Sequence, residues 1–468
     1  MLFTEGRFFV LFAVAFGVYW SLRSNCARKI WILACSDVFY GAWNWRFLGL
    51  MYASITIDYT MGRLLGMQRP PGGRRLWVVV SIVANLSFLG FFKYYGFFVD
   101  SAIELLRALG FSPHPRTLQF VLPAGISFYT FESMSYTIDI YRRQAKAVRS
   151  YLDFAFFISF FPHLVAGPIV RPHQLFPQLE TKRLWRNVDV RACCTLFLVG
   201  FFKKAVIADN VASVCDPVFH APAAWDAASH WSALLLYHVQ LYCDFSGYTD
   251  MALATAGLLG YRLPPNFDFP HLARSVIEWW SKWHMSLTSW VRDYLYIPLG
   301  GNRLGTARTY LNLYIVYFLF GLWHGGSWNM VVFGLTHGTL LALNRAWRET
   351  GLATSWLGRV LAPLSMPITT FCLLLTWPVF RGEGLAGTGK IFAALAGHHD
   401  ADARTASAWW LVLFAVLAIV HAANRRAVFG KLVDRLPHWA YAVGWGSAFA
   451  ITLLFVAQGY RRFIYFQF

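Results

Sequence analysis

Charged residues are scarce in this sequence. Asp, Glu, Lys and Arg make up 14% of its 468 residues, and 57% of the residues are hydrophobic. An ordinary soluble domain has roughly 25% charged residues. Three runs without any charged residue occupy 76–92, 360–380 and 439–460, and about 20 helical residues suffice to cross the hydrocarbon core of a bilayer. This composition excludes a soluble globular protein and predicts a multi-spanning integral membrane protein.

Shorter apolar segments add to these runs. They lie at 8–20, 30–47, 192–202, 231–243 and 406–420. No small-residue cleavage site follows the first of them, so we expect a retained span there and not a signal peptide. The segments together predict an all-α polytopic fold of about ten to twelve spans with interfacial and re-entrant helices. We expect a single membrane domain over residues 1–468.

Acidic residues are fewer than basic ones. The sequence has 23 Asp and Glu against 41 Lys and Arg, a formal net charge of +18. No soluble basic domain with a groove-reading element is visible, so we predict no nucleic-acid partner. Basic clusters at 142–146, 182–191 and 203–204 are typical of loops that face anionic headgroups on the cytoplasmic side. Alternatively, they dock an acidic or phosphate-bearing partner.

The sequence also lacks the motifs of several chemistries. Its seven cysteines are scattered, without a C-x-x-C pair or a Cys/His spacing that suits a metal. It has no G-x-S-x-G nucleophile motif, no P-loop and no G-x-G-x-x-G loop. We therefore expect no metal and no cofactor. Direct attack by an acceptor under general-base catalysis is the economical mechanism.

Three segments depart from the pattern of a plain spanning helix. Residues 121–170 are apolar but interrupted by Pro, Gly and acidic residues, which predicts internal architecture and not a lipid-facing helix. Residues 278–290 predict a Trp-rich interfacial helix with Trp280, His284 and Thr288 on one face. Residues 299–303 predict a turn.

A charge-free run of 35 residues occupies 310–344. It is too long for one span and tight for two, since one span needs about 20 residues. Residues 321–329 at its middle include four glycine or serine residues beside His324. We predict a broken or bent helix with its break next to this histidine.

Histidines are the first candidates for chemistry. An ionisable group deep in a membrane is a functional-site hypothesis by default, which favours His324 over the alternative of a structural histidine in an aromatic belt. His284 alone suits the membrane interface. His337 follows His324 by thirteen residues, nearly 20 Å along an unbroken helix. We therefore interpret His337 as structural, and only a broken helix would let the two act on the same atom. His163 could line the same interior as His324.

Four carboxylates could serve as bases: Glu132, Asp244, Asp250 and Asp293. Simpler interpretations exist for three of them. Asp244 and Asp250 suit helix caps, and Asp293 is next to Arg292, which predicts an ion pair.

Four motifs carry a family resemblance. They are 242–248 (YCDFSGY), 283–287 (WHMSL), 290–303 (WVRDYLYIPLGGNR) and 321–325 (GLWHG). With them, nearly the whole chain resembles the membrane-bound O-acyltransferase (MBOAT) family, in the bacterial branch of the alginate O-acetylation protein. The resemblance implies an MBOAT fold around a central tunnel, with a catalytic core at about 120–345.

The resemblance also implies residues and a reaction. The invariant histidine of the family matches His324, and a second histidine of this branch matches His284. Further substrate-binding candidates in or beside the motifs are Trp283, Trp323, Asn302, Arg303 and Asp244. The implied reaction moves a short acyl group, acetyl, from a cytoplasmic thioester toward hydroxyls of an extracytoplasmic polysaccharide.

The implied partners follow from this reaction. The donor is acetyl-CoA or an acyl carrier protein, and a periplasmic acetyltransferase protein could complete the transfer to the polysaccharide. Membrane lipid surrounds the chain in the bacterial inner membrane. Two other classes remain as alternatives: a transporter, for which we find no inverted repeat, and a scaffold subunit of a polysaccharide secretion complex.

Overall fold

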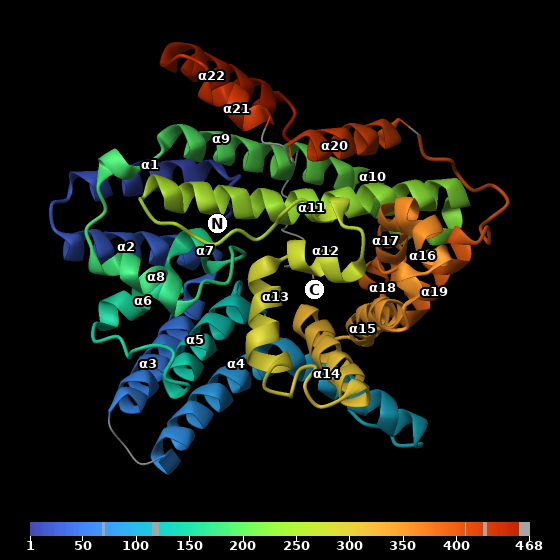
Figure 1. Cartoon of the computed structure of the whole chain (residues 1–468), viewed down its shortest axis with the longest axis horizontal. Helices are drawn as coiled ribbons and strands as arrows, with labels where there is room; N and C mark the ends of the chain where they lie inside the picture. The colour runs from blue at the N-terminus through green and yellow to red at the C-terminus, as the bar shows by residue number, and fades with distance from the viewer. Residues whose placement is uncertain (68–70, 115–120, 408, 425–427, 458–468) are drawn as a thin grey trace. The chain divides into compact units, whose positions relative to one another are not determined.

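The computed structural model describes residues 1–67, 71–114, 121–407, 409–424 and 428–457 (Figure 1). Within these ranges the chain is helical, with one isolated bridge between Trp225 and Arg404 in place of any strand. The chain forms two compact units. The first comprises Met1–Phe197 and Tyr248–Pro264, and the second comprises Leu198–Gly247 and Pro265–Phe468. The all-α prediction is confirmed for the described residues, in agreement with an MBOAT fold.

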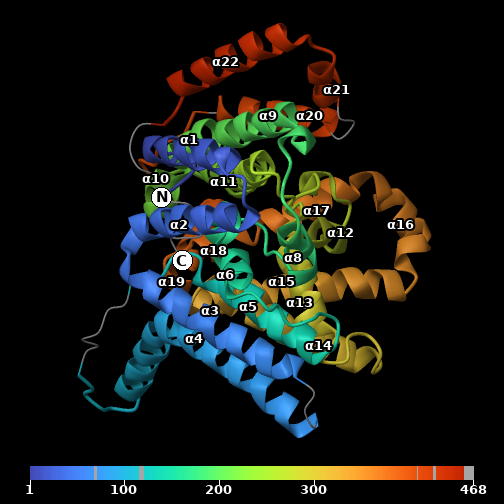
Figure 2. The same cartoon turned by 90° about the vertical axis from the view of Figure 1, so that its left-hand side faces the viewer.

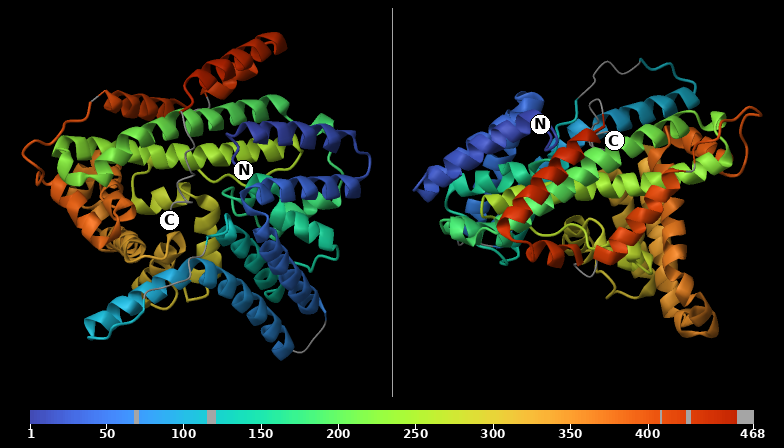
Figure 3. Two further views of the ribbon diagram at one scale, coloured as in Figure 1. Left: turned by 180° about the vertical axis from the view of Figure 1, so that it is seen from behind. Right: turned by 90° about the horizontal axis from the view of Figure 1, so that it is seen from above.

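The first unit begins with four long helices and continues with shorter ones. They are α1 (Gly6–Ser21), α2 (Asn25–Asn44), α3 (Arg46–Gly66), α4 (Pro71–Ala108), α5 (Ile126–Tyr141), α6 (Tyr151–Ser159), α7 (Phe161–Leu164), α8 (Pro172–Glu180), the 3₁₀ turn η1 (Trp185–Asn187) and most of α9 (Val190–Phe201). Helices α3, α4 and α5 pack side by side (Figure 2). Figure 3 shows that α4 changes direction partway along its length.

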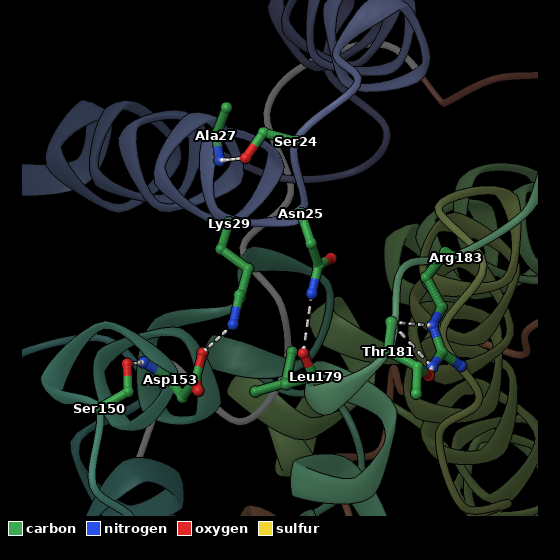
Figure 4. A network of polar contacts seen from close by, with 9 residues as sticks. All are labelled: Ser24, Asn25, Ala27, Lys29, Ser150, Asp153, Leu179, Thr181 and Arg183. Carbon is green, nitrogen blue, oxygen red and sulfur yellow. Dashed lines mark hydrogen bonds and ion pairs between the residues drawn. The ribbon is translucent and has the colours of Figure 1, made fainter.

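Polar contacts connect the helices of this unit (Figure 4). Lys29 of α2 pairs with Asp153 of α6, and the Asn25 amide donates to the Leu179 carbonyl of α8 at 3.0 Å. Helix α5 is buried along nearly its whole length. Residues 123–140 and 154–170 are almost wholly buried, whereas residues 141–151 are mostly exposed. The prediction that residues 121–170 form internal architecture is therefore confirmed for the first two of these ranges.

The second unit holds the remaining elements. They are η2 (Phe202–Ala208), α10 (Asp209–His220), η3 (Pro222–Ala224), most of α11 (Ala227–Leu258), η4 (Pro270–Leu272), α12 (Val276–Lys282), α13 (Met285–Val291), η5 (Arg292–Tyr296), α14 (Thr306–His324), α15 (Trp328–Glu349), η6 (Leu352–Thr354), α16 (Trp356–Leu361), η7 (Ala362–Leu364), α17 (Ser365–Leu374), α18 (Trp377–Arg381), α19 (Gly384–Leu395), α20 (Trp410–Asn424), α21 (Val428–Asp434) and α22 (His438–Leu454). Figure 1 shows α12 and α13 meeting at a corner. Both α12 and α14 pack against α15.

Two described segments are long and apolar enough to cross a membrane, Gly72–Ala108 and Trp356–Arg381. They contain the predicted runs 76–92 and 360–380. Helix α22 covers most of the third run, whose last three residues lie outside the described ranges. Gly6–Ser21, Gly384–Leu395 and Trp410–Asn424 are shorter apolar helices. The count of ten to twelve spans stays a prediction.

Exposed apolar side chains accompany these helices. Val83 of α4, Ile419 of α20 and Leu453 of α22 each have at least half of their surface exposed. Soluble proteins rarely expose apolar side chains in large continuous patches. Such helix faces suit contact with lipid.

Candidate active site

The charge-free run is a broken helix, as predicted. Helix α14 ends at His324, residues 325–327 turn the chain, and α15 begins at Trp328, with Ser327 capping it through the backbone N–H of Met330. The two helices pack closely at Gly321 and Gly334. A Cβ atom on Gly321 would lie 2.1 Å from the carbonyl oxygen of Met330, and one on Gly334 would lie 2.1 Å from that of Tyr317. Only glycine permits this approach.

His324 is buried among aromatic rings of α14, α15 and α18. Its ring centroid lies 4.6 Å from Phe320, 4.8 Å from Trp323, 5.6 Å from Phe333 and 5.6 Å from Phe380. The break after His324 places this imidazole at the end of its helix, inside the protein. The position predicted from sequence is thus a buried, ring-lined site.

The predicted single helix over residues 278–290 is wrong. Helix α12 ends at Lys282 and α13 begins at Met285, with His284 between them at φ +45° in the left-handed region. Trp280, His284 and Thr288 therefore do not share one helical face. Left-handed backbone is costly for a residue other than glycine and collects at functional sites.

Asn266 holds this turn from a distant part of the sequence. Its side-chain oxygen accepts from the backbone N–H of Ser286 at 3.2 Å and from the Ser286 hydroxyl at 2.8 Å. Its backbone carbonyl accepts from the N–H of Met285 at 2.9 Å. Asn266 is itself buried. These bonds satisfy the first backbone groups of α13 and fix the conformation at His284.

Trp323 connects the two predicted catalytic histidines. Its ring centroid is 5.9 Å from His284 and 4.8 Å from His324. His284 has a second aromatic neighbour, Phe245 of α11, which contacts it edge-on at 4.6 Å. His284 lies between two seven-residue helices, outside the candidate spans, and burial lowers its pKa to about 3. Its imidazole is therefore neutral at physiological pH.

Asn329 ties the start of α15 to the segment that follows Phe380. Its amide donates to the carbonyls of Gly382 at 2.7 Å and Gly384 at 3.1 Å, and to the Thr388 hydroxyl at 3.0 Å. These bonds join the start of α15 to the segment between α18 and α19. Phe380 of α18, which contacts His324, is held in place by the same connection.

Of the other predicted substrate-binding residues, one is buried and two are exposed. Trp283 is buried, stacks on Trp279 at 4.9 Å and meets Phe267 edge-on at 5.1 Å. Asn302 and Arg303 lie exposed in the predicted turn, where Gly300 and Gly301 adopt positive φ. The turn at 299–303 is confirmed.

Asp244 and Asp250 are not helix caps, because both lie inside α11. The Asp244 carboxylate lies 2.5 Å from the ammonium of Lys204, which also pairs with Asp209 at 2.7 Å. Lys203 donates to the Ser246 hydroxyl at 3.0 Å. Residues 203–204 therefore form no headgroup-facing loop, since they belong to the helical segment η2 and Lys204 is buried.

Two further polar predictions concern Asp293 and His163. The predicted pair of Arg292 and Asp293 is confirmed, with Nε and Oδ1 2.7 Å apart. His163 belongs to the first unit, where its Nε2 lies 3.3 Å from Glu132 Oε2, while Glu132 Oε1 accepts from the N–H of Val170. Among the described residues no group of three or more His, Cys, Asp or Glu side chains could hold a metal ion.

Asn266 was missed by the sequence analysis, and the structure places His337 closer to His324 than the spacing along an unbroken helix suggests. Asn266 follows two prolines (residues 264–265), and this Pro-Pro-Asn turn is the signal that could have drawn attention to it. His337 is brought back toward the histidine site by the break in the helix. Its ring lies 4.6 Å from Phe333, which also contacts His324.

Comparison with known proteins identifies the family of the chain. The sequence profile of the membrane-bound O-acyltransferase family matches residues 142–358. A probable alginate O-acetylase AlgI of Azotobacter vinelandii is 36% identical over the whole of both chains. One from Pseudomonas aeruginosa is 40% identical over 84% of this chain and 75% of its own length. A peptidoglycan O-acetyltransferase of Helicobacter pylori is 33% identical over 83% of this chain and 78% of its own.

The chain therefore belongs to the membrane-bound O-acyltransferase family, a class of membrane enzymes. Its similarity to several alginate O-acetylases places it in the alginate O-acetylation branch of that family. It is an O-acetyltransferase, as the motifs around His284 and His324 predicted.

Proposed function

We propose that this enzyme transfers an acetyl group from a thioester on the cytoplasmic side to hydroxyls of an extracytoplasmic polysaccharide. The transfer is direct or passes through a periplasmic acetyltransferase partner protein. The relatives named for alginate and peptidoglycan acetylation support a polysaccharide as final acceptor. The donor is acetyl-CoA or an acetylated carrier protein, and the enzyme spans the inner membrane several times as a single domain, with its catalytic core at about 120–345.

The observation that carries the mechanism is the pair of buried histidines that both contact the ring of Trp323. His324 acts as general base and removes the proton of the acceptor hydroxyl as its oxygen attacks the thioester carbonyl. The tetrahedral intermediate collapses, the carbon–sulfur bond breaks, and His324 returns the proton to the departing thiolate. An ester and a free thiol result, so atoms and charges balance.

His284 has a different role in this mechanism. A neutral imidazole can donate one hydrogen bond, and from His284 this bond stabilises the oxygen that becomes negative in the intermediate. The turn at φ +45° fixes the direction of the imidazole before substrate binds. Such preorganised donors commonly contribute two to three orders of magnitude, about 2.7–4 kcal/mol, to the rate.

The remaining predicted site residues surround the substrate or support the fold in this proposal. The Trp323 ring contacts both histidines, and Trp283 packs against Trp279 and Phe267. We assign both indoles to the apolar surroundings of a short acyl chain. Asn302 and Arg303 are exposed and available to a polar part of a substrate. Asp244 is engaged with Lys204, so we assign it a structural role next to Phe245.

Ester-linked acetate on extracellular polysaccharide tests the function. Cells would carry the parental protein, His324→Ala, His284→Ala or His399→Ala, an exposed histidine outside the site as matched control. We expect loss of ester with the first variant, at least a hundredfold reduction with the second, and normal ester with the control. Each protein's abundance in the membrane is measured alongside. Normal ester with a stably inserted His324→Ala protein would refute the proposal and favour a transporter or scaffold.

A further inference from the structure

His337 lies beside the histidine site because the helix is broken. The close approach of α14 and α15 at Gly321 and Gly334 folds the chain back, and His337 is on α15 one turn after Gly334. Phe333 contacts both imidazoles, at 5.6 Å for His324 and 4.6 Å for His337. The two histidines are thus one aromatic side chain apart, and the separation expected along an unbroken helix does not apply.

The ring nitrogens of His337 and of two neighbouring indoles are buried without hydrogen bonds to the described residues. His337 is fully buried, and neither of its ring nitrogens has a hydrogen-bond partner among the residues that the structure describes. Two indoles of α12 surround it, Trp280 edge-on at 5.3 Å and Trp279 stacked at 6.1 Å. The Nε1 atoms of both indoles are also buried, and no described residue bonds to them. Native proteins leave few buried polar groups unpaired, so four such atoms together need an explanation.

The chemistry of these atoms limits what can bind them. Each indole has one N–H donor and no acceptor, and a neutral imidazole has one donor and one acceptor. Together they offer three donors and one acceptor among rings without charge. A matching ligand group is neutral, accepts two or more hydrogen bonds and donates one. An amide does this, with its carbonyl oxygen and its N–H.

We propose that His337, together with Trp279 and Trp280, binds an amide of the donor's thioester arm and thereby positions the thioester at His324. This rests on the proposed function. The arms of coenzyme A and of acyl carrier proteins carry amides a few bonds from the sulfur, a spacing that suits histidines one side chain apart. His337 is a positioning residue here, since it does not touch the reacting carbonyl.

The test measures each protein variant with two thioester donors, one with an amide and one without. Inside-out membrane vesicles from producing cells keep partner proteins and present the cytoplasmic face to added donor. One donor is S-acetyl-N-acetylcysteamine, which has an amide, and the other is S-ethyl thioacetate, which has none. The initial rate of thiol release is measured at several donor concentrations and gives kcat/KM once it is divided by the amount of enzyme. Vesicles that carry His324→Ala give the background rate.

We expect the parental enzyme to prefer the amide-bearing donor by on the order of tenfold, the effect of about one hydrogen bond. His337→Phe should remove this preference, so that the ratio of kcat/KM between the two donors falls to about one. His337→Asn, which keeps a donor and an acceptor, should retain part of it. Trp280→Phe should reduce it, whereas Trp356→Phe, at an exposed indole, should not.

Other outcomes overturn the inference. If His337→Phe retains the preference, an ordered water satisfies these atoms and they bind no donor. If it slows both donors equally, while His337→Asn does the same, the residue supports the fold only. If the parental vesicles release no more thiol than the His324→Ala background with either donor, the proposed function itself fails.

Discussion

The side-chain oxygen of Asn266 accepts two hydrogen bonds from Ser286, one from its backbone N–H at 3.2 Å and one from its hydroxyl at 2.8 Å. Ser286 is two residues after His284. The loop at residue 266 therefore determines the backbone of a predicted catalytic residue. In a buried site, such supporting bonds decide whether a side chain is held within the small tolerance that catalysis requires.

Asn266→Ala should reduce activity without removing any group that touches substrate. The loss of two bonds costs about 1–3 kcal/mol, and the left-handed turn at His284 is then free to relax. We expect transfer to fall at least tenfold, with a smaller loss of membrane abundance. Initial rates in membrane vesicles measure this, and Asn187→Ala, at an exposed asparagine, is the control. Full activity of the Asn266 variant would show that the turn holds without it.

Gly321→Ala should separate α14 from α15. The new methyl group would lie 2.1 Å from a backbone oxygen, which cannot move aside as a flexible side chain can. Overpacking of this kind costs about 1–3 kcal/mol or more, and it displaces both His324 and His337. Thermal unfolding of the detergent-purified protein should show a lower Tm together with lower activity.

Gly389→Ala is the matched control for that variant. Gly389 is inside α19, and a Cβ there meets no atom within 4 Å. Alanine is favoured over glycine in helices by up to about 1 kcal/mol, so the Tm should stay constant or rise. Equal Tm values for the two variants would contradict the close packing of α14 against α15.

Lys204→Met should destabilise the protein more than a surface substitution does. It leaves the Asp244 carboxylate buried without its cation, and breaking a buried pair from one side costs about 3–5 kcal/mol. Replacing Asp244 with leucine in the same protein removes the stranded charge, so the double variant should recover much of the stability. Denaturation midpoints of the three proteins provide the comparison. A double variant as unstable as Lys204→Met alone would assign the effect to Asp209 or to packing.

Much of the fold could be predicted from local patterns. The charge-free run of 310–344 was too long for one span, and the glycines near His324 placed the break where the structure has it. The interrupted apolar stretch of 121–170 likewise indicated a buried interior, which the structure shows for 123–140 and 154–170. These predictions succeeded because length and composition within one segment determine the result.

The errors come from contacts between segments far apart in sequence. Helical periodicity over 278–290 cannot reveal that Asn266, about twenty residues earlier, holds His284 in a left-handed turn. In the same way, Asp244 suggested a helix cap because its partner Lys204 comes from another helical segment. The place of His337 beside Phe333 likewise depends on how α15 folds back on α14, which spacing along the sequence does not give. The family motifs identified both predicted catalytic histidines, but not the residues that support them.

The central claim is that His324 transfers the proton between acceptor and thiolate. The most direct measurement is the initial rate of acetyl transfer by purified, correctly folded His324→Gln protein, with a labelled acetyl thioester as donor and Tm as the check on folding. The account predicts a rate at least a hundredfold below that of the parental protein at equal Tm. A rate equal to that of the parental protein would contradict it.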